Sequence, residues 1–470
     1  MSKCSDYFVS ENELQMQKEY CEKVFNLNAQ SGGVKRFFVH SFGCQQNVAD
    51  GEKIKGQLSL MGYVETDEIS EADVIFYNTC AVRENAEARV FGNVGEIKHL
   101  KKQNPELIVG LCGCMTQQKS ISDKIKKSYP YVDIIAGTHA LHKIPEFVFG
   151  ILEKRKKIIY NEDCFGVIAE NLPVMRDSTL KAWVPIMYGC NNFCTYCIVP
   201  YVRGRERSRK SEDILKEVRG LVENGYKEIT LLGQNVNSYG NGVDGEISFS
   251  QLLRKINDIP GEFRIRFMTS HPKDASRELI DTMAECEKVC KHLHLPVQCG
   301  SDRVLKEMNR SYTTEKYLDI VNYAKEKIPE ISLTSDIIVG FPSESYEEFL
   351  QTAELIKKVE YDLIYTFVYS KREGTKAALM KDDISPKQKG LWLRELIKIQ
   401  EEITLKRMDE LVGKTLRVLV DGLGKNEGYV TSRSDTNIVV EFIGDESLIG
   451  EFVDVKITQA QNWAVIGEKI

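Results

Sequence analysis

The sequence predicts an α/β protein made of three parts: an N-terminal doubly wound parallel sheet, a central partial (β/α)6 barrel and a small C-terminal antiparallel β-barrel. Three observations predict this fold. Apolar strand patterns alternate with helical patterns through the first two parts, which is typical of parallel sheets. After a long charged helix ending near residue 410, only short strands separated by Gly, Asn and Asp turns follow. The length of 470 residues also suits about three domains.

Composition and charge exclude several classes of protein. The chain is 42% apolar and 28% charged and has no run of 18 apolar residues, so we expect a globular protein with no membrane partner. The N-terminus lacks the basic start and apolar stretch of a secretion signal, which favours a cytoplasmic location. With 63 Lys and Arg against 69 Asp and Glu, the net charge is −6, so any nucleic acid must be bound by local patches.

The first domain is expected over residues 34–152, behind an N-terminal extension of residues 1–33 that forms a loose segment or a short helix. Four strands are predicted, over the sequences RFFVHSFGC, ADVIFYNTC, LIVGLCGC and VDIIAG. The first three end at Cys44, Cys80 and Cys114. Because the carboxyl ends of parallel strands meet at one edge, we expect these thiols to converge, an arrangement that suits a metal cluster.

Cys112 is the alternative to Cys114 at this edge. It lies two residues earlier on the same strand, and a strand sends both side chains to one face. We prefer Cys114, which lies nearer the strand end and matches the family pattern named below. In a reducing compartment, the 13 cysteines of the chain point to metal binding or thiol chemistry and away from disulfides.

Residues 176–408 are expected to form the central barrel. Six strands, each but the last followed by a helical pattern, are predicted over WVPIMYGC, EITLLGQN, RIRFMTSH, KHLHLPV, LTSDIIVGF and LIYTFVYS. Functional groups of such a barrel lie at its C-terminal mouth. The strand ends there nominate Gln234, Asn235, Ser270, Gln298 and Gly340 as cofactor-binding residues, with Arg310 as a further candidate for a carboxylate. For each strand-end residue, simple capping of a loop is the alternative.

The most specific motif is Cys190-Asn-Asn-Phe-Cys194-Thr-Tyr-Cys197, which follows the first barrel strand. Three thiolates can hold three irons of a cubane cluster and leave the fourth iron open. An open iron can take the amino and carboxylate groups of S-adenosylmethionine. A structural zinc site is the alternative, but it needs a fourth Cys or His nearby. The next cysteine, Cys286, is 89 residues beyond Cys197, so we predict the cluster.

Two segments are candidates for binding RNA. The segment YVRGRERSRK follows the cysteine loop and carries the candidate phosphate-binding residues Arg203, Arg205, Arg207 and Arg209; a solvated basic face is the alternative. Residues 411–470 predict a five-stranded barrel similar to oligonucleotide-binding folds. That barrel has six Lys or Arg against nine Asp or Glu, so binding there would depend on a few residues: Lys425, Tyr429 and Arg433.

The cysteine loop and six-unit barrel resemble the radical SAM superfamily. FGCQQN around Cys44, NTCAVRENAE around Cys80, GCMTQQ around Cys114 and YCIVPYVRGRERSR narrow the resemblance to the methylthiotransferases of the tRNA-modifying MiaB type. It covers about residues 34–470, and the C-terminal barrel resembles the TRAM domain of that family. The segment GFPSES departs from the family's more usual GFPGET, and GQN stands where radical SAM enzymes often have Gly-Gly-Glu.

The resemblance implies two 4Fe-4S clusters, one on Cys190, Cys194 and Cys197 and an auxiliary one on Cys44, Cys80 and Cys114. It implies that the first cluster cleaves S-adenosylmethionine to a radical that abstracts hydrogen, which makes its three cysteines catalytic. The second carries sulfur, and a second S-adenosylmethionine donates a methyl group. The implied product is a methylthio group on carbon 2 of isopentenyl-adenosine beside the anticodon, made on the anticodon stem-loop of tRNA.

An electron donor protein and a sulfur donor are the further partners that this chemistry implies. Two alternatives keep the chemistry and change the substrate, to threonylcarbamoyl-adenosine of tRNA or to an aspartate of a ribosomal protein. A third alternative is a non-catalytic iron–sulfur protein that binds RNA. A radical route suits the reaction, since an aromatic C–H bond offers no acidic proton at neutral pH.

Overall fold

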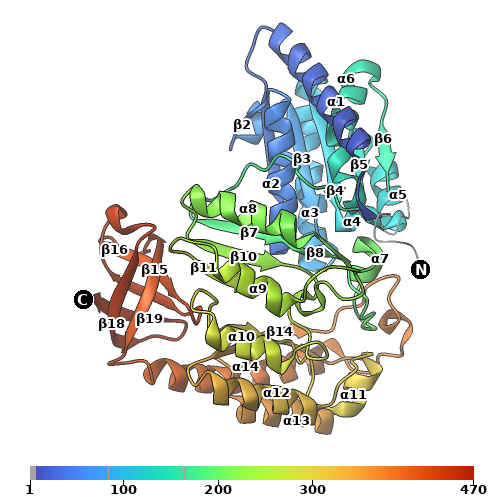
Figure 1. The fold of residues 1–470 in the computed structure, drawn as a ribbon. Helices are drawn as coiled ribbons and strands as arrows, with labels where there is room; N and C mark the ends of the chain where they lie inside the picture. Colours follow the sequence, from blue (N-terminus) through green and yellow to red (C-terminus); the bar gives the residue numbers. More distant parts are fainter. Residues whose placement is uncertain (1–6, 83, 162–165) are drawn as a thin grey trace.

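The computed structural model describes residues 7–82, 84–161 and 166–470. Figure 1 shows an N-terminal sheet with its helices, a central barrel below it, and a small C-terminal barrel beside the central one. This arrangement confirms the predicted α/β class and its three parts. Within the described ranges, no helix is both long enough and apolar enough to cross a bilayer.

The N-terminal extension contains a helix, α1 (Glu11–Gln30), of 20 residues. The Ser10 side chain accepts a hydrogen bond from the backbone of Glu13 and so begins the helix. The helix lies beside α6 (Ile144–Lys154) (Figure 1), where Gln17 donates to Glu146 at 3.1 Å. The extension is therefore a long docked helix and not the loose segment or short helix that its polar sequence predicted; residues 1–6 of it lie outside the described residues.

The N-terminal sheet has six parallel strands in the order β2-β1-β3-β4-β5-β6. Its strands are β1 (Arg36–Ser41), β2 (Val64–Glu65), β3 (Val74–Thr79), β4 (Ile108–Gly113), β5 (Ile134–Ala136) and β6 (Ile158–Tyr160). The helices α2 (Gln45–Leu60), α3 (Glu84–Gln103) and α5 (Lys119–Ser128) join α1 and α6 in covering its two faces. The order reverses between β1 and β3, and ligands of such sheets bind beyond the strand ends at this reversal.

Two short strands of this sheet were not predicted. β2 and β6 have two and three residues, too few for a period to show in the sequence. β6 pairs with β5 along Ile134 to Ala136, so the sheet continues past residue 152, where we expected the domain to end. In the middle of the sheet, β3 and β4 are buried at every residue.

The predicted six-unit barrel is confirmed. Two three-stranded parallel sheets, β7-β10-β11 and β12-β13-β14, are joined by a parallel bridge between Ile265 and Val289. The strands are β7 (Lys181–Pro185), β10 (Glu228–Leu232), β11 (Arg264–Phe267), β12 (His292–His294), β13 (Ser332–Val339) and β14 (Leu363–Val368). The main helices between and after them are α8 (Ser211–Glu223), α9 (Phe249–Asn257), α10 (Arg277–Glu285), α12 (Thr314–Lys327), α13 (Tyr346–Val359) and α14 (Pro386–Asp409).

The C-terminal barrel is closed, with strand order β15-β16-β17-β19-β18. Its strands are β15 (Thr415–Leu423), β16 (Tyr429–Ser434), β17 (Val439–Ile443), β18 (Phe452–Ala460) and β19 (Ala464–Lys469). Four of its five pairings are antiparallel, but β17 and β19 pair in parallel. The barrel is therefore not wholly antiparallel as predicted, because β18 crosses to pair with β15 before β19 returns to close the barrel beside β17.

The C-terminal barrel docks at the amino ends of the central strands, away from the cysteine loop. Glu228 accepts from Arg264 at 2.7 Å and from Arg266 at 2.8 Å, and all three are buried. The two arginines also donate to backbone carbonyls of the C-terminal barrel, at Arg433 and Ser434. Burial works to raise the pKa of Glu228, but Arg266 and Arg264 outweigh it and lower the pKa to about 2.

Candidate metal-cluster sites at the mouth of the barrel

The N-terminal cysteines gather where the sheet order reverses. Cys44 is the N-cap of α2, Cys80 follows β3, and Cys114 begins α4 (Cys114–Gln117) directly after β4. Gly43 has a φ of 127°, and a Cβ there would lie 2.4 Å from the Cβ of Cys80. Only glycine allows this approach. The fold therefore brings together three thiols that are separated by more than 30 residues each in the sequence.

Cys112 and Cys114 have different surroundings. Cys112 is fully buried in the core of the sheet, and its sulfur lies 3.8 Å from the carbonyl oxygen of Tyr77. Gly113 ends the strand with a φ of 103°, so Cys114 does not continue the strand's alternation. Cys114 instead meets a side chain of the central barrel, Arg203. The expectation that both thiols share a face is wrong because the glycine turns the chain between them.

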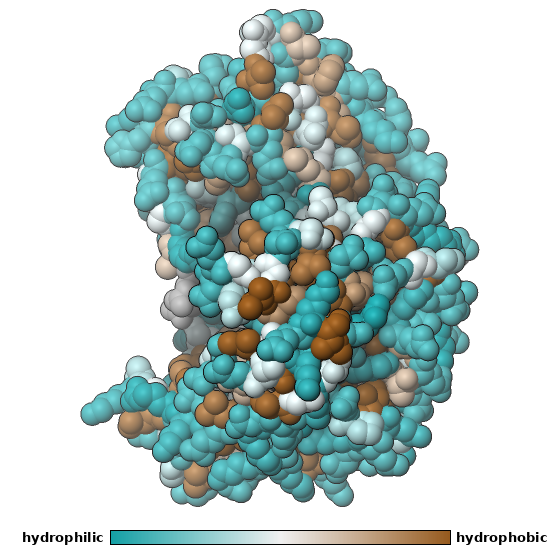
Figure 2. Space-filling model, turned by 90° about the vertical axis from the view of Figure 1, so that its left-hand side faces the viewer, coloured by the Kyte–Doolittle hydropathy of each residue, from teal (hydrophilic) through white to brown (hydrophobic). Residues whose placement is uncertain are grey.

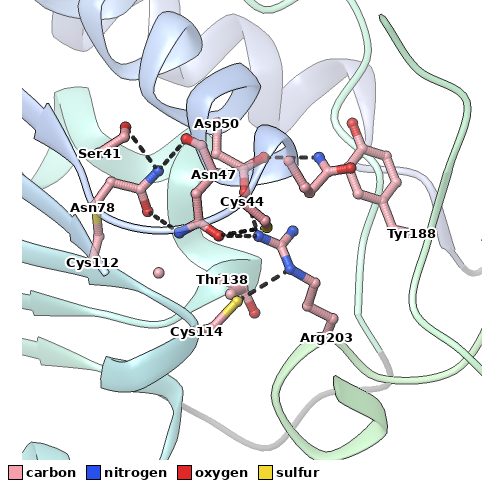
Figure 3. A network of polar contacts seen from close by, with 12 residues as sticks. Ser41, Cys44, Asn47, Asp50, Asn78, Cys112, Cys114, Thr138, Tyr188 and Arg203 are labelled. Carbon is pink, nitrogen blue, oxygen red and sulfur yellow. Dashed lines mark hydrogen bonds and ion pairs between the residues drawn. The ribbon is translucent and has the colours of Figure 1, made fainter. Parts of the chain in front are cut away.

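A polar network surrounds the thiols (Figure 3). The Arg203 guanidinium donates to the Cys114 sulfur at 3.1 Å, to the Asp50 carboxylate at 2.7 Å and to the Asn47 side-chain oxygen at 3.4 Å. The Cys44 thiol donates to the same Asn47 oxygen at 3.3 Å. Sequence reasoning missed Asn47 and Asp50. Asn47 follows Cys44 by three residues and Asp50 follows Asn47 by three, so each is a neighbour of the one before it on α2, and that spacing was the available signal.

Burial keeps these thiols protonated in the absence of a bound metal. It raises the pKa of Cys114 to about 11, although Arg203 works to lower it. A hydrogen bond with Cys80, together with burial, raises the pKa of Cys44. A metal that binds a thiolate displaces this proton.

The second set of thiols lies on one loop of the central barrel. Cys190, Cys194 and Cys197 fall between β8 (Met187–Tyr188) and α7 (Val199–Arg203). β8 pairs in antiparallel fashion with β9 (Arg207–Ser208) and so closes the base of this segment. Burial raises the pKa of Cys190 and that of Cys197 to about 12. Burial therefore keeps these thiols protonated, as it does those of the first set.

Arg310 lies against the second set of thiols. It is buried, and its guanidinium donates to the Tyr312 hydroxyl at 2.8 Å and to the carbonyl oxygen of Pro296. The remaining amino group lies 3.7 Å from the Cys194 sulfur and 3.4 Å from the Tyr196 hydroxyl. The arginine predicted to bind a carboxylate therefore contacts the cysteine loop directly.

Among the strand-end candidates, two present buried polar atoms without a hydrogen-bond partner. Within the described part of the chain, these are Oδ1 of Asn235 and Oγ of Ser270, and Nε2 of His271 is a third such atom nearby. Buried polar atoms are normally paired, so a polar ligand at the mouth would satisfy them. S-adenosylmethionine carries the amino, carboxylate and hydroxyl groups that could do so. This observation fits the cofactor to the mouth.

Three strand-end candidates have other surroundings. The Gln234 side-chain oxygen accepts from the backbone of Gly189, at the start of the cysteine loop, at 2.5 Å. Gln298 has a φ of 71°, and its backbone pairs with β13. Gly340 has a φ of 72° and donates its N–H to the Glu344 carboxylate at 2.6 Å. These residues shape the backbone at the mouth.

Glu344 is a buried carboxylate that sequence reasoning missed. It also accepts from the backbone of Phe341 at 3.1 Å, and burial raises its pKa to about 7. The preceding Ser343, in the departure from the family pattern, has a φ of 70°, a conformation that favours glycine. The sequence did contain a signal for Glu344, because the Glu of GFPSES is also present in the family's usual GFPGET.

Three of the four arginines predicted to bind RNA are buried and already bonded. Arg209 pairs with Glu170 at 2.7 Å and with Glu217 at 2.8 Å, and Arg207 donates to backbone carbonyls. Arg203 donates to the Cys114 sulfur and to the Asp50 carboxylate. The prediction for these three is wrong, because the segment passes between two domains and not over the surface. Arg205 is exposed and lies over the ring of Phe193, 4.3 Å from its centre.

The candidates in the C-terminal barrel are more open. Lys425 is exposed and Tyr429 is partly exposed, whereas Arg433 donates to Asn437 and lies 3.8 Å from Asp421. The face that bears this barrel is largely hydrophilic, with apolar side chains scattered over it (Figure 2). The exposed large apolar residues of the barrel are Val412, Leu423, Ile443, Trp463 and Ile470. Arg433 is thus the least available of the three for RNA.

The thiols are not arranged around a single ion. Within the described ranges, no group of three or more His, Cys, Asp or Glu side chains is placed to hold one metal ion. A structural zinc site requires such a group. An iron–sulfur cubane does not, because each of its irons takes one thiolate. Of the six thiols, Cys80, Cys114 and Cys194 are buried, and Cys44, Cys190 and Cys197 are partly exposed.

Family profiles match all three parts of the chain. The uncharacterized protein family UPF0004 matches residues 36–137, the radical SAM superfamily residues 184–356 and the TRAM domain residues 409–470. Among solved structures, the radical S-adenosylmethionine methyltransferase TsrM from Kitasatospora setae has a TM-score of 0.54 and 12% identity, over 73% of this chain and 75% of that one. At this identity, the likeness concerns the fold alone.

Curated relatives match over almost the whole length. The tRNA-2-methylthio-N(6)-dimethylallyladenosine synthase of Thermoanaerobacter sp. (strain X514) is 52% identical over 468 residues, which cover 99% of each chain. The protein of the same name from Clostridium perfringens (strain 13 / Type A) is 52% identical over 92% of this chain and 97% of its own. A third, from Acetivibrio thermocellus, is 50% identical over 98% and 97%.

Proposed function

The chain belongs to the family of the tRNA-2-methylthio-N(6)-dimethylallyladenosine synthases, and from this premise we propose how its residues carry out the reaction. It is a radical SAM methylthiotransferase that acts on tRNA, and its reaction is the methylthiolation of N6-dimethylallyladenosine. The observation that carries the proposal is the joining of the two cysteine sites: α7 begins two residues after Cys197 and ends at Arg203, which touches Cys114.

We propose that Cys190, Cys194 and Cys197 hold one 4Fe-4S cluster and that Cys44, Cys80 and Cys114 hold an auxiliary one. When bound, the first group supplies an electron that cleaves S-adenosylmethionine to a 5′-deoxyadenosyl radical, and the second supplies the sulfur. Cys114 is preferred over Cys112, whose sulfur is enclosed in the core of the sheet. A second S-adenosylmethionine supplies the methyl group, so one C–H bond of adenine is replaced by C–S–CH3.

Residues at the mouth bind and orient S-adenosylmethionine in this proposal. Asn235 and Ser270 offer polar atoms to its amino, carboxylate or hydroxyl groups, since these atoms are buried without a partner among the described residues. Gln234 holds the start of the cysteine loop through the N–H of Gly189. Glu344 fixes the turn at Gly340 by accepting two backbone N–H groups. Arg310 holds the Cys194 side of the loop.

The surface for RNA is proposed at the same mouth. Arg205 stacks on Phe193, and Phe193 meets the exposed Tyr201 edge to face at 5.9 Å. Aromatic rings and Arg planes are the groups on which unstacked bases settle. Strand β14, the edge of the barrel, adds two exposed aromatic side chains, Tyr365 and Phe367. An anticodon loop, whose adenosine can leave its stack at low cost, fits this surface.

The remaining partners follow from the chemistry. Cleavage of S-adenosylmethionine needs an electron donor protein, and each turnover consumes a sulfur atom that a sulfur donor must replace. We propose both, and with them a cytoplasmic location, where tRNA is modified. Lys425 and Tyr429 of the C-terminal barrel, the part matched by the TRAM domain, are proposed as further contacts to the tRNA.

An anaerobic assay tests the proposed function. The protein is reconstituted with iron and sulfide, then incubated with dithionite, S-adenosylmethionine and tRNA bearing the isopentenyl group, and the nucleosides are analysed by mass spectrometry. We expect 2-methylthio-isopentenyl-adenosine together with 5′-deoxyadenosine. A methylthio product only on threonylcarbamoyl-adenosine or on a ribosomal protein would reject the substrate. No deoxyadenosine with any of these substrates would leave the non-catalytic RNA-binding protein as the better description.

A further inference from the structure

Arg203 is the side chain through which the central barrel contacts the N-terminal thiols. It ends α7 and is only 5% exposed. One nitrogen donates to the Cys114 sulfur at 3.1 Å, and another donates to the Asp50 carboxylate at 2.7 Å (Figure 3). The cation therefore lies between a cluster ligand of the proposed function and a carboxylate on α2.

The surroundings of Arg203 make its charge effective. Burial removes water that would screen the charge, and charges interact more strongly in such surroundings than in water. An arginine side chain is not deprotonated in proteins, so the buried guanidinium keeps its charge. Arg203 contacts the Asp50 carboxylate on α2. The nearby cation of the same helix, Lys53, instead donates to the Tyr188 hydroxyl at 2.8 Å.

Arg310 provides a contrast at the other cysteine site. Its described partners are the hydroxyls of Tyr312 and Tyr196, the carbonyl oxygen of Pro296 and the Cys194 sulfur at 3.7 Å. None of these is a carboxylate. The two sites thus resemble each other in having one buried arginine at a cysteine sulfur, and they differ in that only Arg203 is counterbalanced by a carboxylate contact.

We propose that the Arg203–Asp50 pair sets the reduction potential of the cluster held by Cys44, Cys80 and Cys114. The inference rests on the proposed function, because it assumes that cluster. Reduction adds one negative charge to a cluster, and a cation near a ligand sulfur stabilises that charge. Hydrogen bonds to the sulfurs and nearby net charge are established means of tuning such potentials. Arg203 raises the potential, and Asp50 opposes it by neutralising part of the guanidinium charge.

The test uses the full-length protein with Cys190, Cys194 and Cys197 all changed to Ala, so that one cluster remains. Its reduction potential is measured by redox titration followed by electron paramagnetic resonance. We expect Arg203→Gln to lower the potential and Asp50→Asn to raise it. Each change should alter the ratio of oxidised to reduced cluster at a fixed potential at least tenfold, which corresponds to about 59 mV for one electron.

Two matched variants separate charge from structure. Arg203→Lys keeps the positive charge, so its potential should stay closer to that of the parent than the potential of Arg203→Gln. Lys210→Gln removes an exposed cation from the same segment and should leave the potential unchanged. A merely structural role of the pair would shift both Arg203→Gln and Asp50→Asn in the same direction, or would cost both of them iron, while opposite shifts require an electrostatic role.

The outcomes distinguish this inference from the proposed function. If the parent with three alanines binds no iron, the auxiliary cluster is absent and both ideas fail. If it binds about four irons but neither variant moves the potential, or both move it in the same direction, only the role of Arg203 and Asp50 is overturned. If Arg203→Gln loses its cluster, Asp50→Asn decides: an upward shift of its potential supports the inference, and a downward shift or no shift contradicts it.

Discussion

The two cysteine sites each bring three thiols together, one on a single loop and the other at the ends of three strands. Cys190, Cys194 and Cys197 lie within eight residues on one loop, which the β8–β9 pair closes at its base. Cys44, Cys80 and Cys114 follow three different strands of a parallel sheet. The loop can form within one domain, whereas the second site depends on the register of three strands and on Arg203 from the neighbouring domain.

This difference separates a local site from an assembled one. A local site depends on few contacts, so changes elsewhere in the chain should affect it little. An assembled site is sensitive to the positions of its strands and to the contact between domains, and that contact also places the charged Arg203 beside Cys114.

Removing the local site should abolish both products. With Cys190, Cys194 and Cys197 changed to Ala, we expect no 5′-deoxyadenosine and no methylthio-adenosine, because cleavage of S-adenosylmethionine starts there. Iron should fall by about half from about eight per chain, since the assembled site still binds its own cluster. Product analysis and iron content together check this. Complete loss of iron would mean that the two sites do not bind clusters independently.

Changing Arg310 should weaken the local site without removing it. Arg310→Gln takes away the guanidinium that binds the Pro296 carbonyl and lies beside Cys194. Outer contacts to metal ligands commonly cost 10 to 100-fold when removed, so we expect about that loss in the rate of deoxyadenosine formation. Arg303→Gln is the control, because Arg303 pairs with Glu348 at the surface. Equal losses in both variants would contradict a specific role for Arg310.

Substituting Arg205 tests whether this exposed arginine binds tRNA. Arg205→Ala should raise the KM for tRNA about three- to tenfold and reduce the salt dependence of binding by about one ion, because one exposed cation is lost. The rate of deoxyadenosine formation without tRNA should not change. Lys210→Ala, which removes another exposed cation of the segment, is expected to act less. An equal effect of Lys210→Ala would indicate that tRNA binding depends on the overall positive charge of the segment and not on Arg205 stacked on Phe193.

Glu344 should give the barrel mouth a pH-dependent stability. Its pKa is raised by burial to about 7 from an ordinary value of 4.5. The folded protein therefore binds a proton that the unfolded chain releases, and this stabilisation is lost as the pH rises from 4.5 through 7. Relative to Glu344→Gln, the free energy of unfolding of the parent should fall by about 3 kcal/mol across that range. Denaturant unfolding at several pH values measures it, and a constant difference would contradict the assignment.

The sequence predicted the local site almost completely, and the assembled site in outline. A contiguous C-x3-C-x2-C loop needs no knowledge of the fold, and strand ends in a parallel sheet must share an edge. The sequence did not reveal which side chains of a segment are buried against another domain. The Arg-x-Arg spacing from Arg203 to Arg209 therefore predicted a basic surface, whereas the structure buries three of the four arginines.

Residues that act through others were equally hard to predict. Asn47 and Asp50 look like ordinary polar positions of a helix, and only their contacts with Cys44 and Arg203 give them meaning. The length of α1 escaped prediction for a related reason: its polar sequence has weak periodicity, and its stability comes from docking on α6. Tertiary contact, absent from local sequence, decided each of these cases.

The central claim is that the two sites divide the work, and one reaction tests it directly. The variant with Cys44, Cys80 and Cys114 changed to Ala is incubated anaerobically with dithionite, S-adenosylmethionine and isopentenylated tRNA, and both products are quantified. We predict that 5′-deoxyadenosine still forms while the 2-methylthio nucleoside disappears. If the methylthio product persists, or if deoxyadenosine is lost together with it, the proposed division between the sites is contradicted.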